Sequence, residues 1–143
     1  MAKVGRASRN ASFLRVESLD GTANKTIASS ETGELYILAG DPASQRTITL
    51  PAPKAGAYVK FLVSVEADTA GWKVVVPSGV MLGSLLAHVD STDATTDVAS
   101  DTTDTFFTLE ADTNPGTVIE CVSDGTNWIA SGHVICSVVP TFG

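Results

Sequence analysis

The sequence is poor in the residues and segments that would mark a metal protein, a disulfide-rich domain or a membrane protein. Its 143 residues include two cysteines and two histidines, and charged residues make up 17%, below the usual quarter. No apolar run approaches the eighteen or so residues that span a bilayer. The first residues also lack the apolar core of a secretory signal. We therefore expect a soluble protein without a membrane partner.

Signatures of catalysis are missing as well. The sequence has no Gly-x-Ser-x-Gly motif, and its two histidines have no nucleophile in a recognisable local setting. No glycine-rich loop stands between a strand and a helix, where it would cradle a phosphate. We therefore expect a protein that is not an enzyme and that needs no cofactor.

Both cysteines and both histidines are of the types that bind zinc. The candidates are Cys121, His133 and Cys136, with His88 as a possible fourth ligand. Structural zinc sites use tight paired spacings such as Cys-x2-Cys, which this chain lacks. Both cysteines lie in apolar segments, where a thiol packs as a small hydrophobe. The pattern therefore favours buried free cysteines over a zinc site.

Carboxylates, which are calcium ligands, recur between residues 91 and 105. The four candidates are Asp93, Asp97, Asp101 and Asp104. They do not form the Asp-x-Asp-x-Asp-Gly pattern of a calcium loop, and the residues between them are mostly Ser, Thr and Ala. We interpret residues 91–105 as a long exposed loop without a metal.

Charge is distributed unevenly along the chain, whose formal net charge is −7. The first fifteen residues contain no acid, and no Lys or Arg follows Lys73. This predicts a flexible basic arm, residues 1–12, that reaches an acidic partner surface. The arm contains the cations Lys3, Arg6 and Arg9, and Arg15 follows it in the sequence. We expect these four residues to contact the partner. A merely solvated terminus and an organelle transit peptide are the alternatives, and nucleic-acid binding is disfavoured because the acidic body would repel phosphate.

The strongest positive signal is a strand–Pro/Gly–strand pattern over residues 47–66. Pro51 and Pro53 end the first strand because proline lacks an N–H, and Gly56 lets the chain turn into the second strand. A similar unit runs from Thr108 through Pro115 to residue 123. The remaining apolar segments predict strands over residues 13–18, 35–39, 72–76, 106–109, 128–131 and 134–139, and residues 80–89 fit a strand or a helical turn.

These patterns predict an all-β protein with a single domain, residues 13–143. The expected architecture is a small antiparallel β-sandwich, jelly roll or tulip-like barrel. Asp124-Gly125 predicts a hairpin, because Gly125 accepts the positive φ of a tight turn, and the hairpin would place Cys121 opposite residues 128–130, too far from Cys136 for a disulfide. We expect Trp72 and Trp128 to be core anchors rather than sugar-stacking platforms.

Two segments resemble structural proteins of tailed bacteriophages. They are Ile-Thr-Leu-Pro-x-x-x-x-Gly-x-x-Val-x-Phe at residues 48–61 and Val-Ser-Asp-Gly-Thr-Asn-Trp-Ile-Ala-Ser-Gly at residues 122–132. Both look like parts of capsid decoration, or cement, proteins and of the β-rich heads of phage fibres. The resemblance implies a homotrimer on the outer capsid surface of the virion, bound to the major capsid protein. A head or carbohydrate- and host-binding module of a tail fibre is the alternative.

Overall fold

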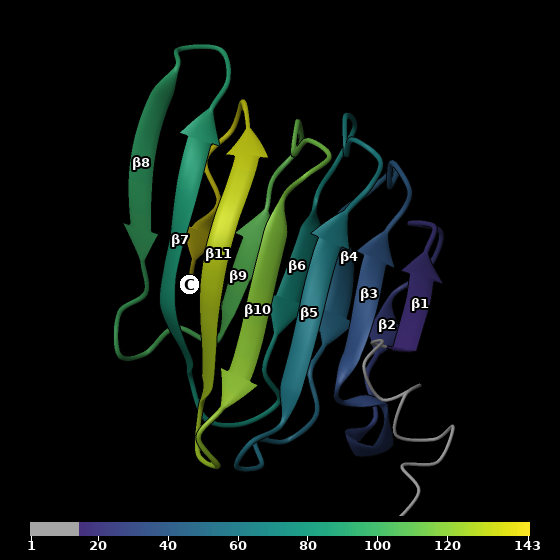
Figure 1. Ribbon diagram of the computed structural model, residues 1–143, viewed down its shortest axis with the longest axis vertical. Coiled ribbons are helices and arrows are strands. Elements are labelled where there is room, and N and C mark those ends of the chain that lie inside the picture. Colours follow the sequence, from purple (N-terminus) through teal and green to yellow (C-terminus); the bar gives the residue numbers. More distant parts are fainter. Residues whose placement is uncertain (1–14) are drawn as a thin grey trace, which may run out of the picture.

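The computed structural model describes residues 15–143, which form strands and one short 3-10 helix (Figure 1). The all-β class expected from the sequence is confirmed. The predicted boundary between arm and body lies outside the described residues. The elements are β1 (Arg15–Leu19), β2 (Lys25–Thr26), η1 (Ser29–Glu31), β3 (Glu34–Leu38), β4 (Arg46–Thr49), β5 (Tyr58–Val63), β6 (Trp72–Val75), β7 (Met81–Val89), β8 (Ala94–Ala99), β9 (Phe106–Leu109), β10 (Val118–Ser123), β11 (Trp128–Cys136) and β12 (Thr141–Phe142).

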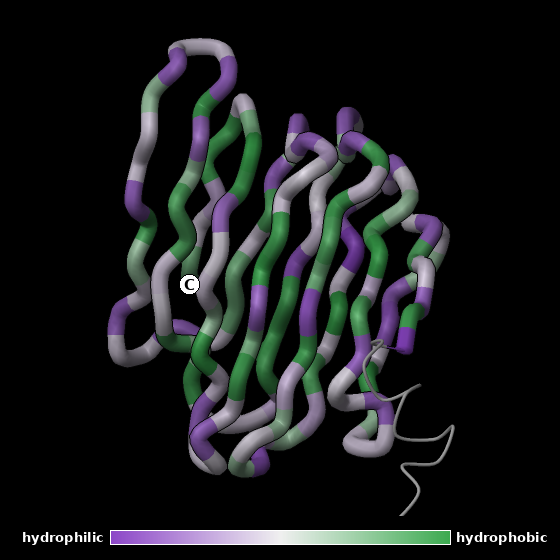
Figure 2. The backbone as a smooth tube through the Cα atoms, in the orientation of Figure 1, coloured by the Kyte–Doolittle hydropathy of each residue, from purple (hydrophilic) through white to green (hydrophobic). Residues whose placement is uncertain are grey.

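Two sheets pack against each other as a sandwich. One sheet has the strand order β1-β3-β5-β10-β11-β7-β8, and the other has the order β12-β9-β6-β4-β2. Buried and less buried residues alternate along strands such as β5, because successive side chains point to opposite faces of a sheet. Figure 2 shows that the central strands are largely hydrophobic, with isolated hydrophilic positions along them. The largest fully buried side chains between the sheets are Trp72, Trp128, Tyr36, Phe61 and Phe107.

The sheets are mixed, which corrects the antiparallel arrangement expected from the sequence. From β1 to β7 the chain alternates between the two sheets. Each passage through the opposite sheet returns the chain to its first sheet in the same direction, so β1, β3 and β5 are parallel neighbours, as are β2, β4 and β6. β7 and β11 are also parallel, whereas β10 is antiparallel to both β5 and β11.

The two Pro/Gly connections both join one sheet to the other. The connection after β4 leads to β5, and the connection after β9 leads to β10. Gly56 in the first connection has φ of +79°, and Gly116 in the second has φ of +94°. The strand–Pro/Gly–strand pattern therefore marks crossovers between layers rather than hairpins.

Residues 91–105 are not the single long loop that the sequence indicates. They contain β8, which pairs antiparallel with β7 after a turn in which Asp93 has φ of +51°. Threonine is a favourable strand residue, and pairing with β7 overrides the polar composition. Residues 80–89, for which the sequence allowed either a strand or a helical turn, contain the strand β7.

A single strand, β11, replaces the two strands expected over residues 128–131 and 134–139. Gly132 lies inside it, where a Cβ would come within 2.1 Å of the Val118 carbonyl oxygen on β10. This glycine therefore permits close approach of two backbones instead of interrupting the strand. In the described part of the chain, no helix has the length and apolar character needed to cross a membrane.

The Asp124-Gly125 hairpin is confirmed between β10 and β11. Gly125 has φ of +105°, and the Asp124 carboxylate accepts hydrogen bonds of 2.7 Å from the N–H groups of Thr126 and Asn127. These bonds lower the pKa of Asp124 because they stabilise its charged form. The hairpin sets Cys121 opposite Ala130, as expected, and both cysteines are buried and free.

Candidate functional site

One side of the seven-stranded sheet points away from the five-stranded sheet, and we call it the outer face. A row of apolar side chains crosses it on four neighbouring strands. Tyr58 on β5 lies opposite Val122 on β10, and Val122 lies opposite Ile129 on β11. Ile129 is in turn opposite Leu82 on β7. This register aligns the four side chains in a row across the sheet, near one end of these strands.

A second apolar row crosses the outer face farther along the same strands. Ile37 on β3 pairs with Leu62 on β5, and Leu62 pairs with Val118 on β10. Val118 pairs with His133 on β11, which pairs with Leu86 on β7. The second row is therefore apolar except at His133.

A single ion pair separates the two apolar rows at the centre of the outer face. Lys60 Nζ lies 3.1 Å from Glu120 Oε1, and the Tyr58 hydroxyl donates a 3.2 Å hydrogen bond to the same oxygen. The pKa of Tyr58 is raised mainly because its hydroxyl is partly removed from water, and the negative charge of Glu120 raises it further. The two charges neutralise each other, so the centre of the face is close to electrically neutral.

Exposed apolar side chains are concentrated on this face. Large hydrophobic residues with substantial exposure in the described residues are Val16, Val65, Leu86, Val122 and Val138. Three of these, Val16 at 57%, Leu86 at 40% and Val122 at 43%, lie on the outer face. A solvated sheet face is ordinarily polar, and a contiguous exposed apolar surface marks an interaction site. The outer face is therefore our candidate functional site.

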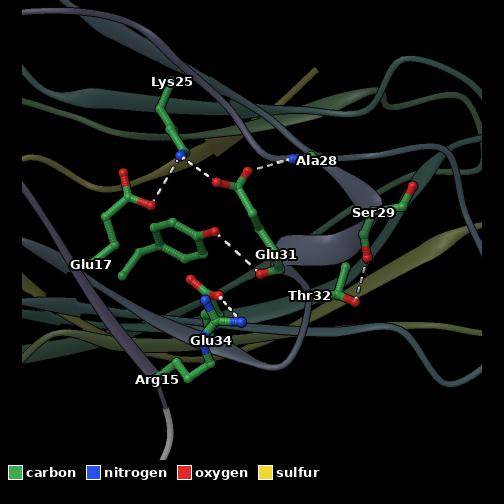
Figure 3. A network of polar contacts seen from close by, with 9 residues as sticks. Arg15, Glu17, Lys25, Ala28, Ser29, Glu31, Thr32 and Glu34 are labelled. Atoms are coloured by element: carbon green, nitrogen blue, oxygen red, sulfur yellow. Dashed lines mark hydrogen bonds and ion pairs between the residues drawn. The ribbon is translucent and has the colours of Figure 1, made fainter.

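A network of polar contacts ties the first elements of the body together beside this sheet (Figure 3). Lys25 Nζ lies 2.9 Å from Glu17 Oε2 and 3.1 Å from Glu31 Oε1. The Glu31 carboxylate also accepts a hydrogen bond from the Ala28 N–H. The backbone carbonyl oxygen of Glu31 accepts a hydrogen bond from the Tyr36 hydroxyl. The hydrogen bond from Ala28 is the main reason why the pKa of Glu31 is lowered, and the hydrogen bond from Lys25 adds to this effect. These contacts fasten η1 and β2 to β1 and β3.

Arg15, the last of the four cations predicted to bind the capsid, takes part in this network, and its capsid contact stays a prediction. Its Nη1 lies 3.3 Å from Glu34 Oε1 on the neighbouring strand β3. The Arg15 side chain is 80% exposed, whereas that of Glu34 is 7% exposed. The guanidinium therefore covers a nearly buried carboxylate within its own body. The other arm residues, Lys3, Arg6 and Arg9, lie outside the described residues, and their capsid contact stays a prediction.

The four residues considered for zinc point to opposite sides of the sheet. Cys121 and Cys136 are buried in the core, whereas His88 and His133 are exposed on the outer face. The two histidine rings meet edge to face with centroids 6.1 Å apart. Sequence reasoning could not pair the histidines, because β7 and β11 are parallel neighbours that are far apart along the chain.

The four aspartates considered for calcium occupy different local structures. Asp93 is in the turn before β8, Asp97 is on β8, and the other two follow that strand. Asp104 Oδ2 accepts the N–H of Asp101, and Asp101 Oδ1 accepts the N–H and hydroxyl of Thr103. These bonds from Thr103 lower the pKa of Asp101. The side chains of Asp101 and Asp104 therefore support a local turn instead of a common ion site.

The structure brings together a different acidic group, which the sequence did not indicate. Ligand atoms of Glu66, Asp68 and Asp112 lie within 4.8 Å of one another, in loops that follow β5 and β9. Glu66 and Asp68 are exposed, and Asp112 is half-buried. Exposed carboxylates of this kind are solvated without an ion, so the group gives no evidence of a metal site.

Two small hollows lie at opposite edges of the seven-stranded sheet. One has a volume of about 190 Å³ and is lined by residues of the β7–β8 turn, including His88 and Asp93. The other has a volume of about 280 Å³ and is lined by Glu17, Lys25 and their neighbours. Both are smaller than typical ligand pockets of roughly 300–1,000 Å³. Neither hollow therefore has the size of a typical small-molecule site.

Both tryptophans lie in the core, where the sequence placed them. Trp128 is fully buried, and its Nε1–H donates a 3.0 Å hydrogen bond to the Pro51 carbonyl oxygen. Trp72 is also fully buried, but its Nε1–H has no partner among the described residues. Neither indole is available as a platform for a sugar ring.

No model of a protein family matches this chain, and no curated protein or solved structure is significantly similar to it. The functional argument therefore rests on the outer face and on the charge pattern of the sequence.

Proposed function

We propose that the protein is a structural component of a virion that decorates the outer surface of a tailed-phage capsid by binding the major capsid protein. The observation that carries this proposal is the exposed apolar outer face, with its two rows of side chains around a single ion pair. Burying such a face against another protein is favourable because it removes apolar surface from water. The phage resemblance of residues 48–61 and 122–132 supplies the identity of the partner.

The outer face has the dimensions that a stable protein interface requires. Seven strands at about 4.8 Å spacing, each of about six residues at 3.3 Å, give a surface of roughly 600 Å² in projection. A standard interface buries about 800 Å² on each partner. Side-chain relief adds to the projected area, so the face alone approaches this value.

The basic arm would add contacts beyond this face. In the sequence, residues 1–12 precede Arg15, the first residue of the edge strand β1. An arm attached at this edge can reach neighbouring shell surface and pair with it through its backbone. Its exposed ion pairs would contribute little, about 0.2–1 kcal/mol each. We therefore expect raised salt to weaken binding modestly, because burial of the apolar face does not depend on screening.

A pelleting experiment tests whether the outer face binds the shell. Val122 and Val138 have similar exposures of 43% and 45%, but Val122 lies on a strand of the outer face, whereas Val138 lies in the connection between β11 and β12. With undecorated heads of the phage that encodes the chain, Val122→Asp is expected to lose co-pelleting, whereas the matched control Val138→Asp is expected to retain it. Equal binding of the two folded variants would contradict the assignment of the face.

A further inference from the structure

Strand β8 forms an unusually open edge of the seven-stranded sheet. It pairs with β7 on one side and with no described strand on the other. Five of its six residues are exposed. In Figure 1, β8 stands at the outer end of its sheet, and β12 is the one strand of the five-stranded sheet that contacts it. The open edge of β8 is therefore accessible, and on its core side only β12 comes close to it.

The other sheet edges are protected in ways that β8 is not. Edge strands β2 and β12 have two residues each, and β1 carries Arg15 and Glu17. Short length and charged side chains are common protections against edge-to-edge pairing. β8 has the sequence Ala-Thr-Thr-Asp-Val-Ala, without proline, glycine or lysine and with one charge, at Asp97. Its composition permits pairing with another strand.

The register of the β7–β8 pair identifies the backbone groups that are free. The Ser100 N–H donates a 2.9 Å hydrogen bond to the Gly83 carbonyl, so this position bonds toward β7. Bonding positions alternate along an antiparallel pair. The N–H and C=O groups of Thr95, Asp97 and Ala99 therefore point away from β7, toward the open edge.

We propose that β8 pairs antiparallel with β8 of a second copy of this chain about a two-fold axis at Thr96, which joins two seven-stranded sheets into one. In this register Thr95 lies opposite Asp97 of the second copy, and their free backbone groups exchange hydrogen bonds. Ala94 lies opposite Val98 of the second copy, so small apolar side chains meet on the same side of the joined sheet. The pairing uses the edge groups of the strand and leaves the outer face open.

Charge and side-chain direction select this register over its neighbours. A two-fold axis at Asp97 would place two carboxylates directly opposite each other, which is destabilising. A slip of one residue would place core-side residues opposite outer-face residues, contrary to the alternation of a continuous sheet. The axis at Thr96 avoids both conflicts.

This inference does not depend on the proposed capsid function. It also differs in stoichiometry from the trimer that the phage resemblance implies, because pairing of identical edges about a two-fold axis closes at two copies. The mass of the assembly in solution therefore distinguishes the two arrangements.

A cysteine cross-link tests the register. Residues at the axis would form a non-hydrogen-bonded pair with Cα atoms about 4.5 Å apart, which is within disulfide range. We expect the Thr96→Cys variant to form covalent dimers on mild oxidation. The control is Asp97→Cys, whose two copies would lie about 8–9 Å apart, beyond that range. The native Cys121 and Cys136 are buried and should not compete. Absence of the Thr96→Cys cross-link, or equal cross-linking of both variants, would overturn the register.

Sedimentation equilibrium of the full chain tests the association itself. We expect wild type to approach twice the mass of one chain as concentration rises. Thr96→Lys, which places two ammonium groups at the axis, should stay monomeric at least tenfold higher in concentration while keeping the wild-type melting temperature. A wild-type mass of one chain or of three chains, or equal association of the Lys variant, would overturn the proposal.

Discussion

The two core tryptophans offer a matched pair of substitutions whose effects should differ for one identifiable reason. Both indoles are fully buried. Trp128 donates a hydrogen bond to the Pro51 carbonyl, in the crossover from β4 to β5, whereas the Trp72 N–H has no partner among the described residues. Replacing either residue by phenylalanine removes similar volume, but only one replacement breaks a hydrogen bond.

The expected difference follows from the group left behind. In Trp128→Phe the buried Pro51 carbonyl loses its partner from the indole, which costs about 1–3 kcal/mol. Trp72→Phe removes an N–H that is already unpaired, so it should lower the free energy of unfolding only through lost packing. We therefore expect Trp128→Phe to be the less stable variant by about 1–3 kcal/mol, or roughly 3–9 °C in melting temperature at about 3 °C per kcal/mol.

Urea denaturation of the two variants measures this difference, and Trp128→Ala provides the upper bound. Loss of the whole indole should cost about 3–5 kcal/mol and unfold much of the population. A Trp128→Phe variant at least as stable as Trp72→Phe would refute the role of the hydrogen bond. A Trp128→Ala melt within a few degrees of wild type would refute the anchor role altogether.

Three further predictions concern the close approach of β7 and β11, the β10–β11 hairpin and the arm. Gly83→Ala should prevent folding, measured by circular dichroism, because its Cβ would lie 1.9 Å from the Ala130 carbonyl oxygen. The pKa of Asp124 is lower in the folded state than in the unfolded state, so the charged carboxylate contributes fully to stability above its unfolded pKa of about 3.9. This contribution is lost as pH falls through the folded pKa. The difference in stability between wild type and Asp124→Asn, measured by urea denaturation, should therefore shrink as pH falls between these two pKa values. Deleting residues 1–12 should leave a folded body with sharply reduced occupancy on pelleted heads, and equal occupancy would place the adhesion on the body alone.

Local turn chemistry in the sequence predicted part of the fold. The Asp-Gly pair indicated the β10–β11 hairpin, because Gly125 takes a positive φ there. Pro51 and Gly56 correctly placed the break between β4 and β5. They could not show that these strands lie in different sheets, because a crossover and a long hairpin loop use the same turn residues. The parallel pairs depend on contacts between distant segments.

The candidate site was less accessible to sequence reasoning than the fold. Segments such as 35–38, Leu-Tyr-Ile-Leu, are apolar at every position, a pattern typical of strands buried on both faces. In the structure Tyr36 and Leu38 are buried, whereas Leu35 and Ile37 are only half-buried on the outer face. Nothing in the run itself distinguishes the covered side from the open one. β8 escaped prediction because its Ser/Thr/Asp-rich surroundings are typical of a loop.

The most direct test of the proposed function is quantitative gel densitometry of purified particles of the phage that the proposal assigns as the source of the chain, with heads separated from tails. The proposal predicts that the chain is found with the heads, at a copy number comparable to that of the major capsid protein. Recovery only with the tails, at far fewer copies, would support the fibre module instead. Absence of the chain from the particle would contradict a structural role in the virion.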